Sequence, residues 1–195
     1  MSKIVLASQS PRRKQLLEWA EIDFEIIVKE TDESFPDNMP ITEVPVHIAR
    51  NKAQAVIASD HSFKERIVLA ADTIVVLDNE VIGKPLNREN AVEIISKLSG
   101  SKHQVITGVV ILQNGKEISF SDTTDVWFHE LTRDQIAYYV DHYKPYDKAG
   151  AYAIQEWIGV VGIKKVEGDF YNVMGLPVSR VVRGLKEMTS APDGR

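Results

Sequence analysis

The stretch VITGVVILQNGKEISFSDTTDVWF, residues 105–128, decides the fold class of this 195-residue chain. Its first part, Val105–Leu112, is almost wholly apolar, and its second part, Ile118–Phe128, is rich in β-branched and aromatic residues. Asn114 and Gly115 between them form the dipeptide that two-residue hairpin turns prefer, because both turn positions need a positive φ. The pattern therefore predicts a long β-hairpin.

Upstream of this hairpin the sequence predicts further strands. Ile4–Ala7 and Phe24–Val28 are short apolar runs, and Ile67–Leu77 is a longer one that only Asp72 interrupts. After the hairpin, two more apolar segments precede the end of the chain, and they are Ile158–Val166 and Val173–Val178.

Helical segments alternate with these strands. Each has apolar residues near the 3.6-residue period or a capping residue at its start. They are a helix beginning at Pro11 with Ser10 as N-cap, Val44–Ser59, Ala91–Leu98 with Asn87 as cap and Gly100 as its stop, Thr132–His142 with a capping box, and a terminal helix ending near Met188.

Alternating strands and helices that include a hairpin predict an α/β fold with a long mixed β-sheet flanked by helices. The length suits a single domain. We expect this domain to span residues 1–188 and residues 189–195 to form a frayed tail.

Composition excludes several classes of function. The chain has no cysteine, so disulfides, thiol catalysis and Cys-ligated zinc are excluded, and its five histidines lack a metal-binding spacing. A net charge of -5 argues against binding to duplex nucleic acid. The N-terminal apolar run is too short for a signal peptide, and no stretch has a membrane-spanning length, so we expect a cytoplasmic protein without a membrane partner.

The run Ser8-Gln9-Ser10-Pro11-Arg12-Arg13 leads from a strand into a helix. Free N–H groups at a helix start favour an anion, and Arg12 and Arg13 add two guanidinium groups that suit phosphate. The alternative is a capped surface helix with solvated arginines. No Walker loop occurs in the chain.

Asp72 is the most informative single residue. A carboxylate inside an apolar strand is costly unless it meets a metal, a cation or hydrogen-bond donors. Asp72 is therefore a candidate general base or Mg²⁺ ligand. The alternative is that it marks a bend at the end of a strand.

Several other polar residues are ordinary by themselves. Glu33 in an acidic loop, Lys52 and Lys84 all suit a solvated surface, although Lys84 lies in the stiff turn Gly83-Lys84-Pro85. His103 is a candidate ligand or base, but a hydrogen-bonded structural histidine is the simpler interpretation.

Two segments suit either loop packing or the wall of a pocket, and the first of them is rich in small residues. Asp147–Gln155 lets the backbone approach a flat ligand closely, and its terminal Gln155 amide matches the imide edge of uracil or thymine. Tyr171–Pro177 likewise suits either loop packing or a pocket wall.

Taken together, the chain resembles the Maf family of nucleotide pyrophosphatases, historically described as septum-formation inhibitors. The resemblance spans nearly the whole chain because its matching pieces occur in the same order. They are LASQSPRR (6–13), AADT (70–73), GKP (83–85), SGSKHQVITG (99–108), DKAGAYAIQ (147–155) and NVMGLP (172–177).

The resemblance implies a fold of the inosine-triphosphate pyrophosphatase type with a cleft between two lobes, dependence on Mg²⁺ or Mn²⁺, and a homodimer. It also implies roles for particular residues. They are Asp72 as catalytic residue, Asp72 and Glu33 as metal ligands, Ser8, Arg13, Lys52 and Lys84 as phosphate-binding residues, and Arg12, Thr73 and Gln155 as specificity residues.

The combination of Arg12, Thr73 and Gln155 is similar to the branch of the family that acts on dTTP and UTP. The resemblance therefore implies a hydrolase that converts dTTP and UTP, with possible extension to modified pyrimidine nucleotides, into the monophosphate and pyrophosphate, in a house-cleaning or cell-division-linked role. Two alternatives stay open. One is a non-catalytic nucleotide-binding regulator of septum formation, and the other is a sister specificity such as 7-methyl-GTP.

Overall fold

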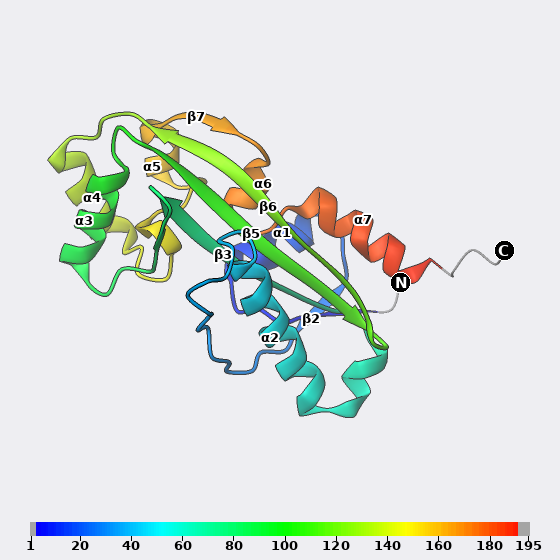
Figure 1. The fold of residues 1–195 in the computed structure, drawn as a ribbon. Coiled ribbons are helices and arrows are strands. Elements are labelled where there is room, and N and C mark those ends of the chain that lie inside the picture. Colours follow the sequence, from blue (N-terminus) through cyan, green and yellow to red (C-terminus); the bar gives the residue numbers. More distant parts are fainter. Residues whose placement is uncertain (1–2, 191–195) are drawn as a thin grey trace. The chain divides into compact units, whose positions relative to one another are not determined.

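A computed structural model describes residues 3–190 of the chain, shown in Figure 1. Its helices (α, and η for 3-10) and strands follow the chain in this order: β1 Ile4–Leu6, α1 Pro11–Trp19, β2 Phe24–Ile26, α2 Val44–Ser59, η1 His61–Glu65, β3 Val68–Leu77, β4 Glu80–Ile82, α3 Arg88–Leu98, β5 Lys102–Gln113, β6 Lys116–Phe128, α4 Arg133–Tyr143, η2 Ala149–Ala151, α5 Trp157–Gly162, β7 Ile163–Glu167, α6 Phe170–Val173 and α7 Val178–Thr189.

The strands of the described residues form a seven-stranded sheet in the order β2-β1-β3-β5-β6-β7, with β4 paired to β3. β1 runs parallel to β2 and β3, whereas β4 and β7 run antiparallel to their partners. A sheet with both kinds of pairing and helices between its strands confirms the predicted mixed α/β fold.

The hairpin that the sequence predicts is formed by β5 and β6. Its turn residues Asn114 and Gly115 have φ values of 51° and 79°, as a two-residue turn of this kind requires. Both strands are longer than predicted, since β5 begins at Lys102 and β6 at Lys116. Lys102 is charged yet belongs to the strand, because its Nζ reaches Asp125 of β6 at 2.8 Å.

The chain divides into two compact units. Unit 1 consists of Met1–Asp72, Thr107–Asp122 and Gly175–Arg195, and unit 2 consists of Thr73–Ile106 and Thr123–Met174. β3, β5 and β6 each contribute residues to both units.

In unit 1, helices cover both faces of the sheet. Val110 of β5 packs with Ala49 and Val56 of α2, whereas the neighbouring Ile111 lies against Gly184 of α7. Successive residues of a strand point to opposite faces, so α2 and α7 lie on opposite sides of β5, as Figure 1 shows.

In unit 2, α3 packs against α4, and the Arg88 guanidinium on α3 binds Asp141 on α4 at 2.5 Å and 2.8 Å. The predicted caps are present at both helices. The side chain of Asn87 accepts from the amide of Asn90, and Thr132 forms a capping box with Gln135 at the start of α4.

Other sequence expectations also differ from the structure. β2 ends at Ile26, two residues earlier than predicted. Ser10 does occupy the N-cap position of α1, but its side chain makes no capping hydrogen bond. Of the predicted tail, Thr189 ends α7, and residues 191–195 lie outside the described part of the chain.

Candidate active site

The sheet reverses its strand order at β1, because β2 lies on one side of β1 and β3 on the other. In open α/β sheets, ligand sites form beyond the carboxyl ends of the strands at such a switch point. Ser8 follows β1 at this end, and Glu33 lies in the loop that follows β2. Leu6 pairs with Leu69, so Asp72 lies further along β3 in the same direction. The topology therefore marks this end of unit 1 as a candidate site.

Lys52, Asp72 and Glu33 form an ion cluster there. The Lys52 Nζ on α2 lies 2.7 Å from Asp72 Oδ1 and 2.7 Å from Glu33 Oε1. The side chains of Asp72 and Lys52 are 14% and 19% exposed, whereas that of Glu33 is 50% exposed. Asp72 is thus a shielded carboxylate held by a cation, and Glu33 closes the cluster on the solvent side.

The structure also decides between the two interpretations of Asp72. β3 continues from Val68 to Leu77 without a break, so Asp72 lies inside the strand and does not mark its end. The alternative of a bend at a strand end is therefore wrong.

Arg13 on α1 is buried, so the interpretation of a solvated surface arginine is wrong for this residue. Its Nε donates to the carbonyl oxygen of Gly175 at 2.8 Å, and its guanidinium also donates to Ser8 Oγ at 2.9 Å. Burial lowers the pKa of Arg13, and the negative charges of Asp72 and Glu33 oppose that shift. An arginine nevertheless stays protonated, so a fixed positive charge acts on the same carboxylates as Lys52 does.

The carboxylates of this site fit a divalent cation bound together with phosphate. Asp72 and Glu33 already converge on one positive group, the Lys52 ammonium, and Mg²⁺ is commonly held by one or two carboxylates plus substrate phosphate oxygens. Within residues 3–190, no cluster of three or more histidine, aspartate or glutamate side chains forms a complete protein cage for a metal.

The specificity candidates Arg12 and Thr73 are direct neighbours of site residues in the chain. Arg12 precedes Arg13 on α1, and its charge contributes to the lowered pKa of Arg13. Thr73 follows Asp72 on β3.

Lys84 and Gln155 belong to unit 2. Lys84 is exposed just after β4, and Gln155 is exposed in a turn before α5. The amide of Gly150 donates to the carbonyl of Gly83 at 3.2 Å, which ties the segment leading to Gln155 to the turn that carries Lys84.

His103 is a buried structural residue. Its Nε2 lies 2.7 Å from the Tyr152 hydroxyl, and its ring packs against Phe128 and Tyr152. Burial lowers the pKa of His103 to about 4, with a small opposing effect from Asp125, so the ring is neutral at pH 7. This agrees with the simpler interpretation of His103.

Sequence reasoning missed the partner of Arg13. Gly175 lies 162 residues away, and only the order of the motifs hinted that NVMGLP belongs with the first helix. In the same segment Asn172 serves loop packing, since its amide donates to the Val105 carbonyl and to Thr124 Oγ1, each at 3.0 Å.

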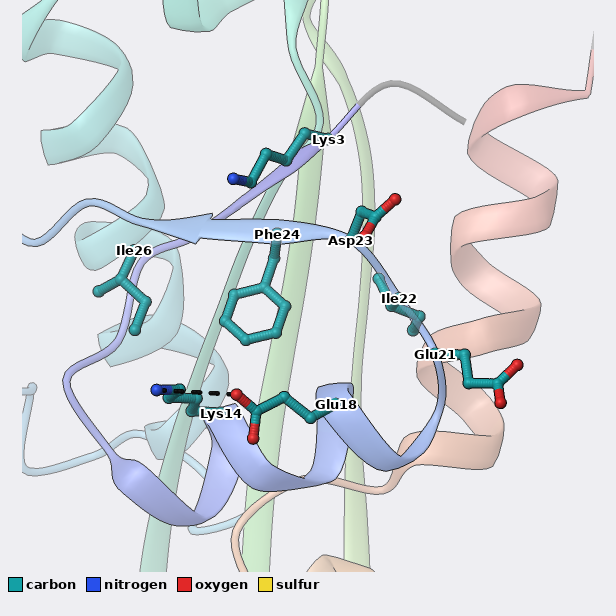
Figure 2. A pocket seen from close by; sticks show the side chains of 8 residues that line it. All are labelled: Lys3, Lys14, Glu18, Glu21, Ile22, Asp23, Phe24 and Ile26. Atoms are coloured by element: carbon teal, nitrogen blue, oxygen red, sulfur yellow. Dashed lines mark ion pairs between the residues drawn. The ribbon is translucent and has the colours of Figure 1, made fainter.

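A separate pocket lies between α1 and β2 (Figure 2). Lys3 at its wall lies at the opposite end of β1 from Ser8, so this pocket is distinct from the ion cluster. The figure shows Lys14 directed toward Glu18, with which it pairs at 3.7 Å. Three carboxylates outnumber two ammonium groups among the lining residues, so this pocket is a poor host for a phosphate chain.

Comparisons with known proteins identify relatives of the chain. The family described as Maf-like protein matches residues 3–188. A protein of Cytophaga hutchinsonii named dTTP/UTP pyrophosphatase is 51% identical over 95% of this chain and 84% of its own length. One of Parabacteroides distasonis with the same name is 49% identical over 94% of this chain and 95% of its own. The solved structure of the Staphylococcus aureus Ham1 protein is similar over 65% of this chain and 72% of that chain, at 15% identity with a TM-score of 0.43.

Within residues 3–190, every helix is too short or too polar to cross a bilayer.

Proposed function

The chain belongs to the Maf family, and we propose that it hydrolyses dTTP and UTP to the monophosphate and pyrophosphate. The observation that carries this proposal is the ion cluster of unit 1, in which Asp72 is shielded in contact with Lys52 and near the buried Arg13. A site that only binds phosphate needs cations, whereas a carboxylate among those cations can also take a proton. The names of the most similar relatives support the choice of substrates.

In the proposed reaction a water molecule attacks the α-phosphorus. A new P–O bond forms to the water oxygen, the bond from the α-phosphorus to the α,β-bridging oxygen breaks, and pyrophosphate leaves. Asp72 orients the water and accepts its proton, whereas Arg13 and Lys52 stabilise negative charge on the phosphates. Ser8 and the start of α1 extend the phosphate cradle. The family resemblance implies Lys84 as a further phosphate-binding residue.

Asp72 and Glu33 would hold Mg²⁺ or Mn²⁺. When bound, the metal neutralises phosphate charge and polarises the reacting phosphoryl group. Lys52, which lies beside both carboxylates, would bind phosphate oxygens of the substrate.

Gln155 would read the pyrimidine ring. Its side-chain amide offers one acceptor and one donor face, which match the N3–H and O4 groups of uracil and thymine. Arg12 and Thr73 would shape selectivity around it. One methyl group in a pocket gives at most about 10–200-fold discrimination, so we expect both dTTP and UTP to be substrates.

The proposal is tested by incubating the purified protein and Mg²⁺ with a panel of canonical and modified nucleoside triphosphates. Pyrophosphate, orthophosphate and monophosphate are measured separately. We expect monophosphate and pyrophosphate from dTTP and UTP, with little product from ATP, GTP or CTP. Release of orthophosphate would mean that water attacks a phosphorus other than the α-phosphorus. If 7-methyl-GTP were the best substrate, the protein would have the sister specificity. If no nucleotide were hydrolysed, a nucleotide-binding regulator would be favoured.

We further propose that the protein is a cytoplasmic homodimer. The family resemblance supports the dimer, and the absence of cysteine together with a nucleotide substrate supports the cytoplasm. Light scattering of the purified protein gives the mass of the assembly, and a value near the monomer mass of 21.9 kDa would contradict the dimer.

A further inference from the structure

Gln155 is presented by a tight turn in unit 2. The amide of Glu156 donates to the carbonyl of Ala153 at 3.1 Å, which closes a turn with Ile154 and Gln155 at its two central positions. Ile154 is buried, whereas Gln155 is exposed. The turn therefore anchors its first central residue in the core and directs the second toward solvent.

A single buried phenol fastens both ends of this turn. The amide of Ala153 donates to the Tyr139 hydroxyl at 3.1 Å, and the same hydroxyl donates to Glu156 Oε2. Tyr139 lies on α4 and is fully buried. The hydroxyl thus donates to Glu156 and accepts from Ala153, which are the residues on either side of the central pair of the turn.

Two further contacts hold the turn. The buried Lys148 pairs with Glu156 Oε1 at 3.5 Å and with Asp147 at 2.8 Å, so Glu156 is fixed through both of its carboxylate oxygens. A Cβ at Gly159 would lie 1.7 Å from the carbonyl oxygen of Ile154, so only glycine lets α5 approach the turn this closely.

We propose that Tyr139 is a positioning residue for base recognition, acting through the Ala153–Glu156 turn on Gln155. This inference rests on the proposed function, in which Gln155 reads the pyrimidine edge. A glutamine amide can turn either its oxygen or its nitrogen toward a base, so it selects one base edge only where its surroundings hold it, and a fixed backbone is the first requirement for this. The buried phenol supplies that fixed backbone, because it couples the turn to the rigid helix α4.

The decisive variant is Tyr139→Phe, with Tyr143→Phe as its matched control. Tyr143 stacks on Tyr139 one turn later on the same helix, but it is partly exposed. We expect Tyr139→Phe to lower kcat/KM for dTTP and UTP by about 10-fold, mainly through KM, because Phe removes both hydrogen bonds that the hydroxyl makes to the turn. The preference for UTP over CTP falls with it. Tyr143→Phe keeps the wild-type values.

A double-mutant cycle with Gln155→Ala separates positioning from general support of the fold. If Tyr139 acts through Gln155, Tyr139→Phe has little further effect on UTP or CTP in the Gln155→Ala background. An equal loss in both backgrounds, or an equal loss for UTP and CTP, would overturn the inference. Glu156→Ala removes the other end of the same bridge and is expected to lower the same preference, which provides a second variant.

A readout independent of activity is the hydrogen exchange of the Ala153 amide in the free protein. It is expected to accelerate in Tyr139→Phe and not in Tyr143→Phe, and unchanged exchange would refute the inference whatever the enzyme does. Absence of pyrophosphate release by the wild-type protein would instead refute the proposed function. If Gln155→Ala left the ranking of nucleotide substrates unaltered, Gln155 would not read the base, and the role proposed for Tyr139 would fail with it.

Discussion

Asp72 is a carboxylate in the middle of an apolar strand, held there by the Lys52 ammonium at 2.7 Å. We predict that Asp72→Asn lowers kcat at least ~10²-fold, the scale expected of a positioned acid–base group. The amide preserves the shape of the side chain, and Lys52 keeps Glu33 as a partner, so the melting temperature is expected to change little. Steady-state kinetics and thermal unfolding measure the two quantities.

The control for this residue is Asp37→Asn, which removes an exposed carboxylate from the loop after β2. It is expected to keep the wild-type kcat. If the kcat of Asp72→Asn equalled that of the control, Asp72 would have no role in the chemical step.

At the scale of the element, two helices that look equally capped in sequence differ in the structure. Thr132 makes a full capping box at α4, whereas Ser10 makes no side-chain cap at α1. We predict that Thr132→Ala costs about 1 kcal/mol of unfolding free energy and Ser10→Ala only about a few tenths. Urea unfolding of both variants measures the difference, and equal losses would contradict the observed caps.

The contact between α2 and β5 depends on a glycine. A Cβ at Gly108 would lie 2.2 Å from the backbone nitrogen of Val46, so the first turn of α2 would have to move. We predict that Gly108→Ala costs about 1–3 kcal/mol or more, as overpacking does. Gly83→Ala is the control, because a Cβ there meets no atom within 4 Å. A urea midpoint for Gly108→Ala as high as that of the control would contradict the close approach.

At the scale of the whole molecule, the buried His103 links stability to pH. Its pKa is about 4 in the folded protein and about 6.5 in the unfolded chain. The unfolded state therefore binds the extra proton first, and stability is lost as the pH falls from 6.5 toward 4. Integrated over this window the loss is about 3 kcal/mol.

Urea unfolding between pH 7 and pH 4.5 measures this loss of stability. The variant His103→Phe keeps a ring in the cluster with Phe128 and Tyr152 but cannot titrate, so its unfolding free energy is expected to fall less over the same window. If the unfolding free energy fell equally with pH in the wild-type protein and in His103→Phe, titratable groups other than His103 would cause the loss.

Much of the fold was predictable because local signals agreed with it. The Asn114-Gly115 turn, the capping box at Thr132 and the helix Val44–Ser59 are each specified by residues close together in the chain, and the structure contains all three. The sequence predicts both strands of this hairpin too short, because charged residues at their starts find partners only in the folded protein. Lys102 pairs with Asp125 of β6, and Lys116 donates to the carbonyl of Glu187 on α7.

By itself, the sequence determined the mixed α/β fold, the family and the candidate residues, because periodicity, turn chemistry and motif order are properties of the chain. Only the tertiary structure decided that Lys52 holds Asp72, that Gly175 accepts from Arg13, and that Tyr139 fastens the turn of Gln155. The physical reason is that the partners within these contacts lie 20, 162 and 14 residues apart. A buried charge or hydroxyl needs a polar partner, and this need can be inferred from the sequence. Which residue becomes that partner depends on strand order and helix packing.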